Sequence, residues 1–267
     1  MIRLVDAHNH LQDERFGGRQ VEIIAAARTV GITRMVVNGS TCSDWADVAA
    51  LARQFPDLII PSFGVHPWYV HEQPTDWEES LRDYLEDFPQ AGVGEVGLDR
   101  WKSDLPWEGQ VDAFRRQLRL ARELKRPVSI HCLRAWGALV DVLESEPLPE
   151  RGLLMHSYGG SAEMVSILIP YGARFSLPGY FLRPDKENKL ATFRRVPSDR
   201  LLIETDAPDQ LPPADLVEYP IVGPDGQPIN HPANLRAIYR RAAEALDRPF
   251  EEFVSQVEAN FAEWFGA

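Results

Sequence analysis

The fold is decided by the stretch between residues 92 and 131. It begins with Gly92-Val93-Gly94-Glu95-Val96-Gly97-Leu98 and ends with Val128-Ser129-Ile130-His131, two largely apolar runs with little polar alternation. Such runs are typical of parallel strands that are buried on both faces. Between them, apolar residues recur every three or four positions, at Val111, Phe114, Leu118, Ala121 and Leu124. This period predicts a helix with one apolar face, so the stretch is predicted to form a strand, a helix and a second strand.

The same alternation extends over most of the 267-residue chain. Further strands are expected at residues 3–8, 34–38, 58–65, 152–156, 174–177 and 201–205, and further helices at residues 18–30, 43–55, 77–86, 135–143 and 162–169. Eight strands with intervening helices favour an α/β fold, a single (β/α)8 TIM-type barrel in one domain over residues 1–267. A doubly wound open sheet is the alternative. It normally needs fewer strands, and no Gly-x-Gly-x-x-Gly motif follows the first strand here.

The pattern changes after the eighth strand. Six prolines between residues 209 and 232 predict an irregular segment, which we call the final loop. Because it follows a strand, this loop would lie at the catalytic end of a barrel. Two C-terminal helices are expected near residues 232–246 and 249–265. The second carries Phe253, Val257, Phe261 and Trp264 on one face, which we expect to pack against the outside of the barrel.

Composition excludes several classes of protein. The chain is 44% hydrophobic and 25% charged, close to the average for globular proteins, which excludes disordered and collagen-like classes. No apolar run approaches the ~18 residues of a membrane span, and no signal-peptide pattern follows Met1. The two cysteines, Cys42 and Cys132, cannot define a disulfide framework. We therefore expect a cytoplasmic protein with no membrane partner and no obligatory protein partner.

Charge limits the kind of substrate. The chain has 28 basic and 40 acidic residues, a net charge of −12, which is the wrong sign for broad binding to a polyanion. A local basic cleft, or a site neutralised by metal, remains compatible with this charge.

Metal-binding residue types gather at the ends of the predicted strands. The first strand ends in Asp6-Ala7-His8-Asn9-His10, and side chains at i and i+2 of a strand point the same way. Glu95, His131, His156 and Asp206 occupy the ends of four other strands. In a barrel these ends form one ring, and histidine with carboxylate suits zinc, manganese or a similar divalent ion.

Six candidate ligands are too many for one tetrahedral site with an open position. They suit two metal ions held about 3.5–4 Å apart and bridged by a carboxylate. Glu95 is the bridging candidate because its two oxygens can each face one ion. A metal-bound hydroxide would then be the nucleophile, and Asp206 could bind one ion and take the nucleophile's proton.

Together these motifs resemble a known family. The set comprises Asp6-Ala7-His8-Asn9-His10, Gly64-Val65-His66-Pro67, Gly94-Glu95-Val96-Gly97-Leu98-Asp99, His131, His156-Ser157-Tyr158-Gly159-Gly160 and Glu204-Thr205-Asp206-Ala207-Pro208. It is similar to the TatD family of metal-dependent hydrolases in the amidohydrolase superfamily of TIM barrels. The resemblance implies a metal-dependent deoxyribonuclease or phosphoesterase that holds two divalent ions (zinc, manganese or magnesium).

The resemblance also implies roles for single residues. His8, His10, Glu95 and Asp206 would hold one ion, and Glu95, His131 and His156 the other. His66 would lie near the substrate phosphate. The sequence departs from the family pattern after His131, where an arginine, Arg134, comes one residue later than in members with His-x-Arg. We expect Arg134 either to bind phosphate or to be an exposed residue that starts a helix.

A second departure from the family pattern leaves more than one class of substrate possible. Between residues 209 and 230 there are four acidic residues and no Lys or Arg, whereas many family members are basic there. The main hypothesis is a hydrolase that acts on DNA ends. The alternative is a hydrolase of a small phosphoester, amide or lactone, and a metal-binding protein without turnover is a third hypothesis.

Four aromatic residues follow the third and fourth predicted strands: Trp68, Tyr69, Trp101 and Trp107. They could stack on a base, but we expect them mainly to pack their loops.

Overall fold

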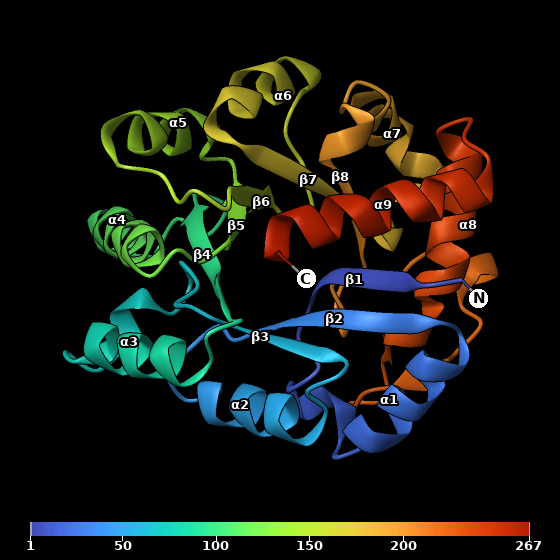
Figure 1. The fold of residues 1–267 in the computed structure, drawn as a ribbon, viewed down its shortest axis with the longest axis horizontal. Coiled ribbons are helices and arrows are strands. Elements are labelled where there is room, and N and C mark those ends of the chain that lie inside the picture. The colour runs from blue at the N-terminus through green and yellow to red at the C-terminus, as the bar shows by residue number, and fades with distance from the viewer. Residues whose placement is uncertain (1, 267) are drawn as a thin grey trace.

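The computed structural model describes residues 2–266 and contains an eight-stranded parallel barrel (Figure 1). The strands pair in chain order, each with the next. Their bounds are β1 Leu4–Asn9, β2 Ile32–Asn38, β3 Ile59–Phe63, β4 Gly92–Asp99, β5 Val128–Leu133, β6 Leu153–Met155, β7 Ala173–Pro178 and β8 Leu201–Glu204. The TIM-type barrel predicted from the sequence is confirmed, and the open sheet is excluded.

Helices surround the strands in the same order (Figure 1). They are α1 Gln20–Thr29, α2 Trp45–Gln54, α3 Trp77–Asp87, α4 Trp107–Glu123, α5 Trp136–Ser145, α6 Ala162–Leu168, α7 Glu187–Phe193 and α8 Leu235–Ala245. The sequence pattern did not predict α7, because this helix spans only 7 residues and contains few apolar positions. No helix within residues 2–266 is long and apolar enough to cross a membrane.

A ninth helix, α9 (Phe250–Phe265), crosses the N-terminal end of the barrel (Figure 1). Glu258 pairs with Arg3, just before β1, at 2.6 Å, and the Asn260 amide donates to the carbonyl of Leu201, the first residue of β8, at 2.8 Å. The helix therefore covers the end opposite to the predicted site, whereas the sequence suggested packing on the outside. All four apolar residues predicted to share a face are buried: Phe253, Val257, Phe261 and Trp264.

The final loop contains a short antiparallel pair that the sequence did not indicate. β9 (Ile221–Val222) pairs with β10 (Pro228–Ile229) around a turn at Gly226, whose φ is +76°. Each of the two strands is only two residues long, which is too short to give an alternating pattern in the sequence.

The first and last strands meet without a regular ladder in the part of the chain that the structure describes. The backbone N–H of Asp206 donates to the His8 carbonyl at 2.9 Å, and the N–H of His10 donates to the Ala207 carbonyl at 2.7 Å. Below them, the N–H of Thr205 donates to the buried Asp6 carboxylate at 2.9 Å. These bonds form the seam of the barrel, and they lie next to the predicted metal ligands.

Gly97 allows β4 to approach β5 closely. It pairs with His131 across the two strands, and its φ of +137° is rarely adopted by residues with a side chain. A Cβ at this position would run into the backbone carbonyl of His131. The glycine thus lets the strand bearing Glu95 lie against the strand bearing His131.

We predict that Gly97→Ala lowers the free energy of unfolding by about 2–4 kcal/mol, from overpacking and left-handed strain together. Gly226→Ala is the matched control, because its φ is also positive but nothing lies within 4 Å of the position that a Cβ would occupy. It should lose only ~1 kcal/mol. Urea unfolding of both variants checks this, and equal losses would contradict the close-approach argument.

Candidate metal centre

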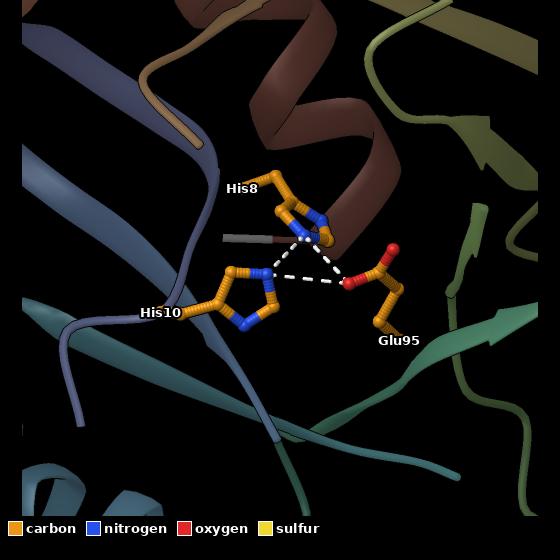
Figure 2. A group of neighbouring side chains, drawn as sticks. All are labelled: His8, His10 and Glu95. Carbon is orange, nitrogen blue, oxygen red and sulfur yellow. Dashed lines mark hydrogen bonds and ion pairs between the residues drawn. The ribbon is translucent and has the colours of Figure 1, made fainter. Parts of the chain in front are cut away.

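Glu95, in β4, lies at the centre of the candidate site with almost no exposed surface. Its Oε2 atom is 3.2 Å from His10 Nε2 and 3.5 Å from His8 Nε2. Figure 2 shows both imidazole rings turned toward this oxygen. Asp206, just after β8, brings its Oδ1 atom to 3.6 Å from His10 Nε2 and 3.8 Å from His8 Nε2. The donor atoms of His8, His10 and Glu95 therefore lie close enough to share one ion, and Asp206 places a carboxylate oxygen beside both rings.

The other oxygen of Glu95 faces a different set of rings. Its Oε1 atom is 2.7 Å from His156 Nε2, 3.1 Å from His131 Nδ1 and 3.4 Å from His66 Nε2. The two oxygens of a single carboxylate are thus divided between two groups of histidines. This division is the geometry that a bridging carboxylate needs.

When two of the rings are neutral, as in a metal-bound form, hydrogen bonds on their far side leave a lone pair directed at Glu95. The Nδ1 atom of His10 lies 2.8 Å from the Asn38 carbonyl, which can only accept, so Nδ1 carries the proton and Nε2 is free. The Nε2 atom of His131 lies 2.9 Å from Asp99 Oδ2, which leaves Nδ1 free. Backbone carbonyls and carboxylates are the usual orienting partners of metal-binding histidines.

His66 has the opposite arrangement. Its Nδ1 atom accepts from the backbone N–H of Trp68 at 3.2 Å, so a neutral ring carries its proton on Nε2. His66, Glu95 and His131 lie close enough to share an ion, but a protonated Nε2 cannot be a ligand. The ring instead presents a hydrogen-bond donor to the site.

A third group, His8, His156 and Glu204, also lies within metal-binding distance. Glu204 Oε1 already accepts from the Ser157 N–H and hydroxyl, each at 2.7 Å, and Oε2 accepts from the Ser176 hydroxyl. It lies 3.8 Å from His156 Nδ1, a buried atom without a hydrogen-bond partner within residues 2–266. Glu204 is therefore already engaged by three donors, and it faces His156 from behind without a hydrogen bond to that ring.

The pKa values in the cluster reflect burial and charge together. Burial opposes charge on every ring, but the carboxylates of Glu95 and Asp206 raise the pKa of His10 well above its ordinary value. The pKa of His156 is raised well above its ordinary value against the same burial, chiefly by Glu95. The pKa of Glu95 is correspondingly held well below its usual range. Burial lowers the pKa of His8 to about 4, with the charge of His156 acting in the same direction.

The remaining predicted residue lies apart from the cluster. Arg134 follows β5 with an exposed side chain and a φ of +56°. Within residues 2–266 it forms no hydrogen bond or ion pair with the Glu95 cluster.

No role was predicted from the sequence for Asp99 or Glu204, although both lie in the quoted motifs. A carboxylate two to four residues from a candidate ligand was the available signal.

The donor set fits divalent cations. It offers histidine nitrogens and carboxylate oxygens and no thiolate, which suits zinc or manganese better than magnesium, which prefers oxygen ligands. A buried, ionised carboxylate surrounded by imidazoles is costly in the absence of compensating charge. The arrangement can hold divalent ions and place them beside a proton acceptor, Asp206, and a neutral donor, His66.

Comparison with known proteins gives one family. The family model described as TatD related DNase matches residues 5–266. The uncharacterized metal-dependent hydrolase YjjV of Escherichia coli is 27% identical over 262 residues, 97% of this chain and 96% of its own. The 3'-5' ssDNA/RNA exonuclease TatD of Pantoea vagans is 28% identical over 258 residues, 96% of this chain and 97% of its own. The crystal structure of YjjV, a TatD homolog, superposes with a TM-score of 0.89 at 26% identity, over 100% of this chain and 99% of the other.

We predict that divalent ions displace protons from this centre. The raised pKa values of His10 and His156 favour the charged, doubly protonated rings in the metal-free protein, and a bound ion needs a lone pair from each ring. Metal affinity should therefore rise with pH above about 6.5, where rings with a raised pKa lose their second proton. Calorimetric titration in buffers of different ionisation enthalpy measures the protons released. Release should shrink in His10→Gln and persist in His71→Gln, and a buffer-independent heat would contradict the assignment.

We also predict that Asp99→Asn weakens metal binding by about 10- to 100-fold, because the amide holds the His131 ring and its lone pair less firmly. Burial opposes ionisation of Asp99, but hydrogen bonding from His131 lowers its pKa to about 2, so the native group is a carboxylate. Competition with a chelator measures the affinity. The exposed Asp104, in the same loop, provides the control Asp104→Asn, and equal affinities in the two variants would remove Asp99 from this role.

Proposed function

The chain belongs to the TatD-related DNase family, so it is a metal-dependent hydrolase of ester bonds, and we propose that it cleaves nucleotides from the ends of single-stranded DNA. The observation that carries the proposal is the division of the Glu95 oxygens between two groups of histidines. Relatives named 3'-5' ssDNA/RNA exonucleases support an end-directed action on single strands.

The residues would hold two ions. His8, His10 and Asp206 would bind the first together with Glu95 Oε2, and His131 and His156 the second together with Glu95 Oε1. Two such cations would lower the pKa of the attacking water and neutralise charge on the phosphodiester. Zinc and manganese fit the nitrogen-rich donor set best.

Asp206 would take the proton of the attacking water. It follows β8, with its backbone N–H fixed to the His8 carbonyl at 2.9 Å. That bond and the left-handed φ of +52° direct its side chain toward the rings of His8 and His10. A carboxylate at this place can bind an ion through one oxygen and accept a proton through the other.

His66 would bind the substrate phosphate. Its Nε2–H points into the site from the segment after β3, and burial lowers its pKa to about 4, so the ring is neutral at pH 7. A neutral donor can hold a phosphoryl oxygen without repelling the nearby cations.

Binding would be limited to a few nucleotides. The final loop supplies no Lys or Arg between residues 209 and 230. Arg15, which lies beside it, is fully engaged by Asp13 at 2.7 Å and Asp209 at 2.7 Å. A long strand would therefore find few cations along this side of the mouth, which is why we propose ends and not internal sites.

The alternative substrate is a small phosphoester, amide or lactone. The acidic final loop favours it, because such molecules carry little charge to neutralise. The same residues would serve either reaction, so the alternative differs only in the substrate that the mouth of the barrel recognises.

We further propose that the protein acts in the cytoplasm, since both cysteines, Cys42 and Cys132, are free thiols.

We predict that Asp206→Asn reduces hydrolysis of a short single-stranded oligonucleotide by at least about 100-fold, because the amide retains the shape but accepts no proton. The assay follows shortening from labelled ends, with bis-(p-nitrophenyl) phosphate and N-acyl compounds in parallel. The exposed Asp225→Asn, in the final loop, is the control and should retain full activity. Metal content near two ions per chain in the wild type tests the bridged centre. Turnover of the small compounds with no cleavage of DNA would support the alternative.

A further inference from the structure

An exposed tryptophan lies at the catalytic end of the barrel. Trp101 follows β4 and is 53% exposed, which differs from the packing role expected from the sequence. Leu133, the last residue of β5, is also exposed and pairs in register with Asp99. The backbone N–H of Arg100 donates to the Leu133 carbonyl at 2.9 Å, so the residue before Trp101 is bonded to the end of β5. An exposed tryptophan at the catalytic end of a barrel is a candidate contact for the substrate.

Trp101 is connected to the metal centre through a second tryptophan. The rings of Trp101 and Trp68 lie 6.2 Å apart and are tilted by 33°. The Trp68 ring in turn lies 5.1 Å from the His66 ring and 6.3 Å from the His131 ring. We call Trp68 and Trp101 the tryptophan platform, which thus extends from the cluster to the rim of the mouth.

One carboxylate fixes the platform and a predicted metal ligand together. Asp99 Oδ1 accepts from the backbone N–H of Trp101 at 2.6 Å, and Oδ2 accepts from the Trp68 indole N–H at 2.8 Å. The same Oδ2 atom lies 2.9 Å from His131 Nε2. The position of the platform relative to the centre is therefore set by a rigid buried group and not by a mobile loop.

Unpaired positive charge accompanies the platform. The Lys102 ammonium lies 3.6 Å from the centre of the Trp68 ring, and the Arg100 guanidinium lies 3.9 Å from that of Trp107. Neither side chain forms an ion pair with a carboxylate within residues 2–266. On the opposite side of the mouth, Arg15 is neutralised by two carboxylates. The β4 and β5 side of the mouth therefore combines aromatic surface with available cations.

We infer that the tryptophan platform stacks on a nucleobase beside the scissile phosphodiester, and that Lys102 binds the adjoining backbone phosphate. The inference rests on the proposed function, since it names the part of the substrate that the same site would hold. Aromatic side chains beside cations are the usual means of binding single strands, because every base has a π-face to offer. A base in a duplex is already stacked and paired, so a blunt duplex end should be a poor substrate.

The test compares two substrates that differ only in their bases. One is a short oligothymidylate, and the other carries abasic tetrahydrofuran residues at the two positions that flank its 3′-terminal phosphodiester. In Trp101→Ala, KM for the first should rise about 10- to 100-fold with kcat retained, matching a stacking free energy of ~1–3 kcal/mol per base. For the abasic substrate the variant should equal the wild type. Trp101→Phe should restore most of the affinity, and Val222→Ala, an exposed apolar residue of the final loop, is the matched control.

Lys102 is tested by salt dependence. In Lys102→Gln, the slope of log affinity against log salt concentration for the oligothymidylate should fall by ~0.7, the contribution of one phosphate contact on a single strand. Lys125→Gln, between α4 and β5 at the opposite end of the barrel, should leave the slope unchanged. An unaltered slope in Lys102→Gln would remove this residue from phosphate binding.

The outcomes separate this inference from the proposed function. Equal losses on both substrates in Trp101→Ala, or no loss on either, would overturn the platform while leaving the nuclease intact. If the wild type cleaves no oligonucleotide, the proposed function fails. Binding of the uncleaved oligothymidylate and its abasic counterpart to wild type and Trp101→Ala then decides the platform, with equal affinities overturning it.

Discussion

The buried carboxylate of Glu95 is the constraint around which the catalytic end of the barrel is organised. A lone buried carboxylate would be strongly disfavoured, and here imidazole rings from four other strand ends compensate it. Several of these rings are held from behind by a hydrogen-bonding group of their own, such as the Asn38 carbonyl for His10 and Asp99 for His131. The strand ends are therefore fixed with respect to one another by the same contacts that would bind metal. The close approach of β4 and β5 at Gly97 serves this arrangement as well.

Much of the fold could be predicted because its signals are local. Buried parallel strands leave apolar runs, and all eight were located within a few residues of their observed bounds. Short elements were missed, since α7 and the pair β9–β10 are too brief to establish a period. The place of α9 could not be predicted either. An apolar helix face says that something covers it, but not whether that is the wall or the end of the barrel.

The convergence of the candidate side chains was predictable for a different reason. In a barrel, residues at the strand ends must converge, so six chemistry-bearing side chains could be brought together from their positions alone. What could not be foreseen depends on contacts between distant segments. The proton on Nε2 of His66 follows from the N–H of Trp68, and the exposure of Trp101 depends on how the loop after β4 is held by Asp99. No pattern in the sequence reports such contacts, although the carboxylates that make them stand inside the motifs.

The seam between β8 and β1 implies a structural role for the metal centre as well as a chemical one. His8 and His10 belong to the first strand and its end, and Asp206 follows the last, so an ion shared by them would tie together segments about 200 residues apart in the chain, like a cross-link that closes a long loop. Because β1 and β8 lack a regular ladder of backbone hydrogen bonds, such an ion would stabilise the contact between them. The same atoms would then hold the barrel closed and perform its chemistry, and removal of the ion would destabilise the contact between β8 and β1.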